Sequence, residues 1–257
     1  MNIAEYTEYV KNLRKELIPT PEEILNEIYP LSKFPQWTQE RFRKNASIFV
    51  EEVRNLCWTK YLDYEDEFTK AAYEPLMEEH SSEPISQRDT IINFVTLHSD
   101  SLFWLHKSTS NSRRSRAGRT FELIVYKLLD QAGIEYDTQK KIGKQVWSDS
   151  SLGKIVDCVI PSAEQYNQDK RNCTLLSMKT SLRERWQEVV EEMKRTAASH
   201  VMLATLDTEI TNATIGHLND HNITLVVPKA NKDNLYSEFN SVLDFETLIA
   251  EEAAKLP

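Results

Sequence analysis

The sequence predicts an α/β fold in which an all-helical first part precedes a mixed, roughly five-stranded sheet flanked by helices. Two patterns carry this prediction. Through residue 107, apolar residues recur at every third or fourth position, the spacing of helices that bury one face. Short runs of β-branched and aliphatic residues begin only after Gly133, and helical stretches separate the later runs.

The first part contains clear helix signals. Pro19 ends the first helix, and Thr20 to Glu23 has the form of a capping box, in which a hydroxyl and a carboxylate satisfy free amides of the next helix. Thr38 is placed to cap a long third helix. The predicted helices span about residues 2–17, 21–30, 38–64, 65–79 and 91–107, with a loop at 80–87.

A polar and then strongly basic segment, residues 108–119, marks the largest change in composition, and we expect a loop there. A helix follows from Thr120 to Gln131, with Gly133 as its C-terminal cap. The predicted strands are residues 134–138, 155–160, 174–178, 201–206 and 223–227. Helices near 182–197 and 213–220 separate the last three strands, and a final amphipathic helix covers 244–255.

The composition is that of a soluble protein. Charged residues make up 28% and hydrophobic residues 40% of the 257-residue chain. No apolar run approaches the roughly 18 residues needed to cross a bilayer, and the N-terminus lacks a signal-peptide layout, so we expect a cytoplasmic protein without a membrane partner. Cys57, Cys158 and Cys173 are too few and too widely spaced for a disulfide framework or a zinc knuckle.

The net charge of −9 makes the placement of basic residues more informative than their number. Positive charge gathers at Arg113, Arg114, Arg116 and Arg119, and again at Arg183, Arg185 and Arg195. An acidic protein with basic patches can still bind DNA, because its contacts with phosphates are local.

An acid on one predicted strand and a lysine at the end of the next form the candidate active site. A hairpin would place the side chains of Asp157 and Lys179 next to each other. Hydrolysis of a phosphodiester needs stabilised charge on the phosphoryl oxygens and a positioned water, which carboxylates holding Mg²⁺ and a nearby lysine supply. These residues indicate a nuclease. The alternative is a strand-edge acid, a solvated lysine and a charged outer helix face.

The usual nuclease pattern, Asp followed by Asp/Glu-x-Lys, would place an acid where this chain has Ser177. The following helix offers replacements, since Glu188 and Glu192 share one face and Glu191 lies beside them. Glu122, after the basic segment, is a further acid that could approach the site. The histidines show no ligand spacing, so a metal site of carboxylates would take Mg²⁺, with Mn²⁺ as an alternative.

Three motifs in fixed order resemble the SsoII/EcoRII group of type II restriction endonucleases, which have a variant of the PD-(D/E)xK nuclease core. They are S-R-A-G-R-x-F-E at 115–122, G-K-x-V-D at 153–157 and S-M-K-T-S-L-R-E-R-W-Q-E-V at 177–189. The resemblance covers roughly residues 113–228. It implies a restriction-endonuclease-like core.

The resemblance also implies roles for individual residues. The family's metal and catalytic positions correspond to Glu122, Asp157, Lys179 and Glu192, with Asp157 and Glu192 as the metal ligands. Ser177 is then no defect, because the family moves that carboxylate into the following helix.

In the resembled family, an R-E-R triplet reads neighbouring G and C pairs. It corresponds here to Arg183, Glu184 and Arg185. The chemistry is suitable, since arginine can donate to O6 and N7 of guanine and glutamate can accept from N4 of cytosine. A capping box from Ser181 to Glu184 is the structural alternative.

Arg54 and Trp58 are one helical turn apart. In CCNGG-cutting members of the family, a matching pair sandwiches a base flipped out of the duplex, and both side chains can stack on any base. A core tryptophan covered by an arginine is the alternative. The cluster Arg113, Arg114, Arg116 and Arg119 reads as a phosphate-contacting loop, or else as a charged surface loop without a partner. We take Trp186 as core packing.

The prediction is a homodimeric, or higher oligomeric, Mg²⁺-dependent type II restriction endonuclease that cuts a (pseudo)palindromic double-stranded DNA site of the CCNGG type, leaving 5′ overhangs. A twofold site is matched most simply by a twofold dimer. Residues 1–107 would embrace DNA and dimerise, and residues 108–257 would form the nuclease core, together as one compact unit. The alternatives are a mismatch-nicking repair nuclease on the same core and a non-catalytic DNA-binding module.

Overall fold

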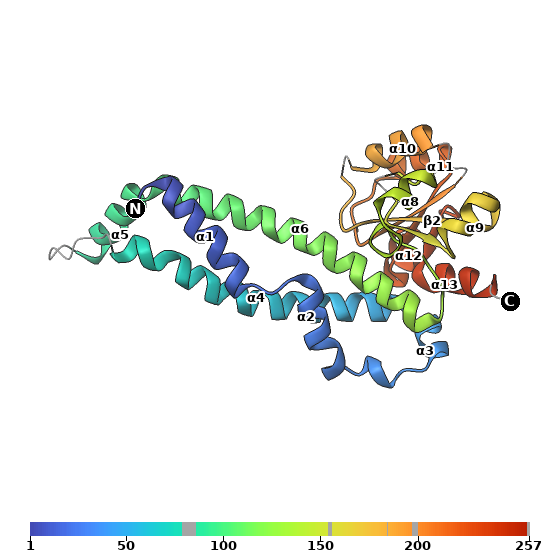
Figure 1. Ribbon diagram of the computed structural model, residues 1–257, viewed down its shortest axis with the longest axis horizontal. Helices are drawn as coiled ribbons and strands as arrows, with labels where there is room; N and C mark the ends of the chain where they lie inside the picture. Colours follow the sequence, from blue (N-terminus) through green and yellow to red (C-terminus); the bar gives the residue numbers. More distant parts are fainter. Residues whose placement is uncertain (79–85, 154–155, 184, 197–199, 256–257) are drawn as a thin grey trace. The chain divides into compact units, whose positions relative to one another are not determined.

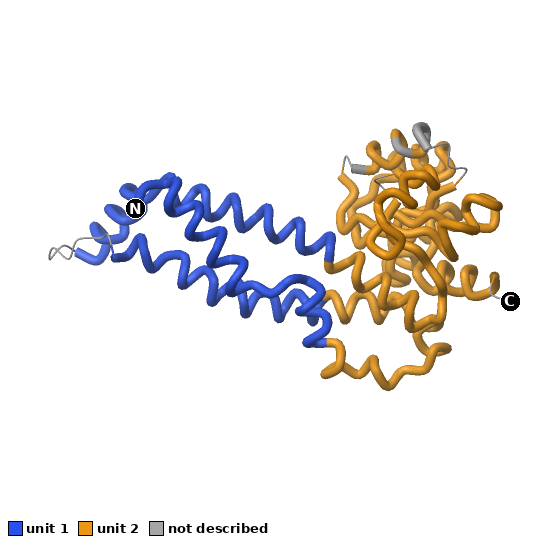
Figure 2. Tube along the Cα trace, in the orientation of Figure 1, with its two compact units in different colours: residues 1–28, 55–119 blue, residues 29–54, 120–257 orange. Residues whose placement is uncertain are grey.

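The computed structural model describes residues 1–78, 86–153, 156–183, 185–196 and 200–255, without the side chains of residues 185, 192 and 194–196. The chain forms two compact units, residues 1–28 with 55–119 and residues 29–54 with 120–257 (Figure 2). The boundaries between them fall within two long helices, α4 (Ala46–Glu78) and α6 (Ser99–Ala132) (Figure 1).

The first unit is helical, as the sequence predicts. Besides its parts of α4 and α6, it contains α1 (Ile3–Leu17), α2 (Pro21–Ile28) and α5 (Gln87–Leu97). The predicted capping box at α2 is confirmed, since the Thr20 N–H donates to the Glu23 carboxylate (2.7 Å) and the Glu23 N–H donates to the Thr20 hydroxyl (3.2 Å).

Hydrogen bonds fasten α1 to both long helices. The buried Tyr6 donates its hydroxyl to the Ala72 carbonyl of α4 (2.9 Å), and Arg14 donates to the Ser108 hydroxyl of α6 (2.7 Å). The Arg14 guanidinium also lies 4.8 Å from the centre of the buried Phe68 ring. The first unit therefore combines an apolar core with arginines that bond across its helices.

The prediction of a loop at residues 108–119 is wrong, because this segment lies inside α6. It contains no proline, and Gly118 is its only glycine. Two of its arginines have partners within the unit: Arg113 pairs with Glu65 of α4, and Arg116 donates to the carbonyls of Ile18 and Pro19. The polar composition thus reflects side-chain bonding between helices rather than a break in the chain.

Two predicted helices are interrupted. The helix expected at 38–64 consists of α3 (Gln39–Lys44) and the start of α4, because Asn45 leaves helical geometry at φ −135° and donates its side-chain amide to the Arg41 carbonyl. The helix expected at 91–107 is divided between α5 and α6 at His98. The loop expected at 80–87 falls largely on residues 79–85, which lie outside the described residues.

The second unit contains the predicted mixed sheet, which is confirmed with five strands. Its order is β1-β2-β3-β4-β5, with β1 antiparallel to β2 and the other neighbours parallel. The strands are β1 (Cys158–Ile160), β2 (Thr174–Lys179), β3 (Val201–Thr205), β4 (Ile223–Val227) and β5 (Val242–Asp244).

One predicted strand is wrong and one strand was missed. Residues 134–138 contribute only an isolated bridge, Asp137 to Val159. The last strand, β5, has only three residues, which is too short to show an alternating pattern in the sequence. Its pairing with β4 in the folded sheet, Val226 to Leu243, identifies it.

Helices accompany the sheet throughout the second unit (Figure 1). They are α7 (Gln139–Ile142), α8 (Lys144–Asp149), α9 (Ala163–Gln168), α10 (Arg185–Thr196), α11 (Asn212–Asp220), α12 (Lys229–Leu235) and α13 (Phe245–Ala254), with 3-10 turns at Tyr29–Leu31, Phe34–Gln36 and Lys170–Asn172. Leu175, Leu203 and Leu225 of three neighbouring strands share one core with Val189 of α10 and Leu218 of α11. This core fixes the ends of β2 and β3, where the candidate site lies.

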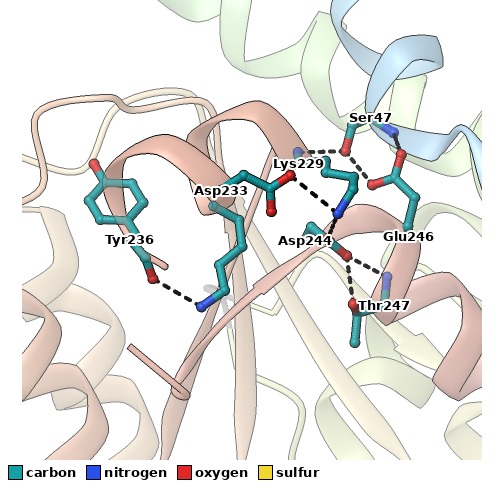
Figure 3. Close-up of polar contacts among 8 residues, drawn as sticks. Ser47, Lys229, Asp233, Tyr236, Asp244, Glu246 and Thr247 are labelled. Atoms are coloured by element: carbon teal, nitrogen blue, oxygen red, sulfur yellow. Dashed lines mark hydrogen bonds and ion pairs between the residues drawn. The ribbon is translucent and has the colours of Figure 1, made fainter. Parts of the chain in front are cut away.

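The start of α4 is fastened to the far end of the chain (Figure 3). Glu246 accepts hydrogen bonds from the Ser47 N–H (2.8 Å) and hydroxyl (2.6 Å), and the Lys229 N–H donates to the Ser47 oxygen (2.8 Å). A carboxylate at a helix N-terminus also interacts favourably with the helix dipole. Among the helices of the described residues, none is both long and apolar enough to cross a membrane.

Candidate active site

The register of the β1–β2 hairpin brings Asp157 and Lys179 together. Cys158 pairs with Leu176, and the Asp157 N–H donates to the Leu176 carbonyl (2.9 Å), so Asp157 lies opposite Ser177. Lys179 is two residues further along and points to the same face of the sheet. Its Nζ lies 3.4 Å from Oδ2 of Asp157, which confirms the predicted juxtaposition.

Asp157 is a largely buried carboxylate whose pKa is raised to about 6. Burial is the main cause, and the negative charge of Glu122 adds to it. Lys179 and the Met178 N–H, which donates to Oδ2 at 2.6 Å, act in the opposite direction. The environment thus penalises the ionised carboxylate, and a bound cation would relieve that penalty.

Lys179 is held by three oxygen atoms. Besides Asp157, it donates to the hydroxyl of Ser177 (3.2 Å) and to the carbonyl of Met178 (3.1 Å). Only 11% of the Lys179 side chain is exposed, and Ser177 is fully buried. Where the usual nuclease motif has an acid, this chain therefore has a neutral acceptor that orients the lysine without adding a third negative charge.

The helix α6 supplies the third predicted residue. Glu122 lies close enough for its charge to raise the pKa of Asp157. Tyr126, one turn later, donates its hydroxyl to the main-chain carbonyl of Asp157 (3.0 Å). Its position one turn after Glu122 was the one signal in the sequence that could have pointed to Tyr126.

The fourth predicted residue, Glu192, lies on α10, and its side chain is outside the described residues. Among the groups that the structure does describe, no three His, Cys, Asp or Glu side chains form a metal-binding cluster. Asp157, Lys179 and Glu122 are therefore the predicted residues that the described structure brings together.

The turn after Lys179 carries the predicted base-reading residues. Arg183 is exposed at a positive φ of 37°, Glu184 lies outside the described residues, and Arg185 begins α10. Because α10 begins at Arg185, Ser181 is too early to be its N-terminal cap. The capping-box alternative therefore does not hold.

Asp207, just after β3, holds this turn in place. Its Oδ2 accepts the Leu182 N–H (2.8 Å), while its own N–H donates to the buried Thr205 hydroxyl (3.1 Å). Asp207 was not among the predicted site residues. An acid directly after a parallel strand that neighbours β2 was the signal that could have identified it.

Trp58 is exposed at 40% of its surface, so the alternative of a core tryptophan is wrong. Its ring stacks on Tyr61, with centroids 5.3 Å apart, and the arginine over it is Arg113, at 5.8 Å from the ring centre. Arg54, one turn earlier on α4, is also exposed. Trp186 packs against the core of the second unit, as predicted, and stacks on His217 of α11.

The basic cluster is divided in its contacts. Arg113 and Arg116 bond within the first unit, Arg114 is exposed, and Arg119 is partly buried. Arg114 is therefore the member whose exposed position best suits contact with an external phosphate.

The chain matches known restriction enzymes over nearly all of its length. The sequence model of the EcoRII C-terminal family matches residues 78–249. The type II restriction enzyme SsoII from Shigella sonnei is 36% identical over 246 residues, which cover 96% of this chain and 81% of SsoII. The type II restriction enzyme EcoRII from Escherichia coli is 28% identical over 134 residues, covering 51% of this chain and 31% of EcoRII.

Solved structures show the same similarity. Metal-depleted Ecl18kI in complex with uncleaved DNA superposes with a TM-score of 0.90 at 34% identity, covering 99% of this chain and 84% of Ecl18kI. The PspGI–substrate DNA complex, at 20% identity and a TM-score of 0.67, supports the fold alone. With the sheet, the Asp157–Lys179 pair and these matches in agreement, the chain belongs to the EcoRII C-terminal family and is a type II restriction endonuclease of the SsoII/EcoRII type.

Proposed function

We propose that this endonuclease cuts both strands of a short (pseudo)palindromic DNA site of the CCNGG type in a Mg²⁺-dependent reaction that leaves 5′ overhangs. The observation that carries the proposal is the placement of Asp157 and Lys179 directly before the turn that holds Arg183. Cleavage and base reading would then share one short segment, so correct base contacts could align the catalytic groups.

The residues present suit a hard divalent cation. Asp157 is a carboxylate whose environment penalises its charge, and Glu122 is a second acid nearby. Asp157 and Glu192 would hold Mg²⁺, or Mn²⁺, and Glu122 would assist. When bound, the cation supplies a positive charge that stabilises the phosphoryl oxygens and favours ionisation of water.

Lys179 is the group that positions the nucleophile. Held by Ser177 and Met178, its ammonium group would donate a hydrogen bond to the attacking water or to a phosphoryl oxygen. The water oxygen would form a bond to phosphorus and lose one proton to solvent, while the bond from phosphorus to O3′ would break and O3′ would take up a proton from solvent as a 3′-hydroxyl. The 5′ end retains the phosphate.

Arg183, Glu184 and Arg185 would read the G and C pairs through the major-groove edges, where two donors match guanine and a carboxylate matches the amino group of cytosine.

Arg54 and Trp58 would stack on a central base flipped out of the duplex. Arg114 would contact a backbone phosphate, and Arg113, Arg116 and Arg119 would add positive charge around it. A homodimer, or a higher oligomer, would match the symmetry of the site.

Sequencing of cleaved ends tests this proposal. Phage DNA incubated with the protein and Mg²⁺ should yield double-strand ends at one recurring CCNGG-type sequence. Single-strand nicks at mismatches would favour a repair nuclease, and binding without cleavage would favour a DNA-binding module.

Replacement of the lysine tests the mechanism. Lys179→Ala should lower the cleavage rate by at least about 100-fold, because the reacting groups lose a positioned charge. Binding of uncleaved DNA should persist. Lys144→Ala, at an exposed lysine of the same unit, is the matched control and should cleave normally. A Lys179→Ala protein that cuts at the normal rate would overturn the mechanism.

A further inference from the structure

Trp58 is the exposed end of a closed set of contacts within the first unit. Trp58 stacks on Tyr61 at 5.3 Å, and Tyr61 donates its hydroxyl to Oε1 of Glu65 (2.6 Å). Glu65 accepts two bonds of 2.9 Å from Nε of Arg113, one to each oxygen, and pairs with its terminal nitrogen. Arg113 in turn lies over the Trp58 ring at 5.8 Å. We call these four residues the Trp58 bracket.

Glu65 is the buried centre of the bracket. It is only 4% exposed, whereas Trp58 is 40% exposed and Arg113 reaches the surface. Burial alone would raise the pKa of the Glu65 carboxyl, but the hydrogen bonds from Arg113 and Tyr61 outweigh it, and the pKa is lowered. The carboxylate is therefore ionised at neutral pH and binds Arg113 firmly.

Two contacts of the bracket restrict the indole. Tyr61 supports one part of the ring by stacking, and the guanidinium of Arg113 is fixed by a carboxylate that is itself buried. An exposed aromatic side chain without such support would lose rotamer freedom on stacking with a base, and that loss weakens binding. The contacts thus pre-organise an aromatic surface that faces solvent.

We propose that Glu65 and Arg113 are positioning residues that hold Trp58 ready to stack on an unpaired nucleobase. This inference rests on the proposed base flipping and extends it. Besides adding positive charge near the DNA backbone, Arg113 would act through Trp58. Because stacking does not read the edges of a base, the bracket would accept any of the four bases.

The test uses two duplexes that differ only at the centre of the cleaved site, one with 2-aminopurine and one with an abasic position. Binding is measured without divalent metal, conditions under which the related Ecl18kI forms a complex with uncleaved DNA. In Glu65→Gln, the rise in 2-aminopurine fluorescence should shrink and affinity for the intact duplex should fall by roughly 3- to 10-fold, the range for loss of one ordered side chain. Affinity for the abasic duplex should not change.

Asp66→Asn is the matched control, since it removes one carboxylate at the next position of the same helix, where Asp66 pairs with the exposed Lys70. Tyr61→Phe keeps the stacked ring and removes one donor to Glu65. It should therefore lower the affinity for the intact duplex, relative to the abasic duplex, by less than Glu65→Gln does. It replaces Glu65→Gln in the test if that variant does not fold. The melting temperatures of Asp66→Asn and Tyr61→Phe should be compared with that of the wild-type protein.

The outcomes separate this inference from the proposed function. If wild-type protein gives no fluorescence rise, base flipping fails and the inference fails with it. If the wild type gives a rise that Glu65→Gln and Tyr61→Phe retain in full, only the inference is overturned. Equal loss of affinity for both duplexes would show a purely structural role and would also overturn it.

Discussion

Glu65 and Asp157 are largely buried carboxylates that both face cations, but their surroundings shift their pKa values in opposite directions. Glu65, in the helical unit, accepts two hydrogen bonds from Arg113 and one from Tyr61, and its pKa is lowered. Asp157, at the sheet edge, has a lysine 3.4 Å away and a second acid nearby, and its pKa is raised to about 6. A satisfied carboxylate holds structure, whereas an under-compensated one is prepared to bind a further cation.

Asp157→Asn should give the largest effect and would test the functional half of this comparison. Cleavage should fall by at least about 1,000-fold, since a charged ligand and the partner of Lys179 are lost together. The metal-free protein should become more stable, by up to about 3 kcal/mol at neutral pH, because a pKa about two units above its usual value is a cost of that size. Chemical denaturation in EDTA measures this change, and a less stable variant would contradict it.

Arg113→Ala tests the structural half. It leaves the Glu65 carboxylate buried without its main partner, and removing one member of a buried pair costs about 3–5 kcal/mol, so about 2–3 kcal/mol is expected here because the Arg113 side chain is 48% exposed. Glu65→Gln should cost less, since no charge remains buried. Thermal denaturation of both variants compares them. Equal destabilisation of Arg113→Ala and Glu65→Gln would show that the unpaired charge of Glu65 does not cause the loss of stability.

The two carboxylates should also respond to pH with opposite signs. The Asp157 pKa is higher in the folded state, so its stabilising contribution is complete below pH 4 and disappears as the pH rises through about 6. The Glu65 pKa is lower in the folded state, so its contribution is present above its usual pKa and is lost as the pH falls. Urea denaturation from pH 4 to 7 should show the difference in stability between Asp157→Asn and wild type growing with pH. A constant difference would contradict the raised pKa.

Tyr126→Phe should have the smallest effect. It removes one hydrogen bond to the Asp157 carbonyl, worth about 1 kcal/mol, while the ring stacked on Tyr136 remains. Cleavage should slow several-fold without a change in DNA affinity, as measured by single-turnover kinetics. A rate equal to that of the wild type would show that the hairpin alone fixes Asp157.

The sequence predicted best what short-range periodicity determines. The positions of Asp157 and Lys179 on two consecutive predicted strands placed their side chains next to each other, and the capping pattern placed the start of α2. Prediction from the sequence failed where the structure of a segment depends on residues far away in the chain. The pairing of Arg113 with Glu65 joins positions 48 apart and makes a polar segment helical, and β5 is recognisable only against β4. The resemblance predicted functional positions, but no local pattern could show which arginines bond internally.

The bond between Ser47 and Glu246 joins residues 199 positions apart. Ribosomes synthesise the chain from its N-terminus, so the start of α4 has no bond from Glu246 until about 200 further residues have been made. The same late segment carries β5, the last strand of the sheet. Completion of the second unit therefore waits for residues 242–246, and nascent chains that stop before residue 242 would lack both β5 and the fastened start of α4.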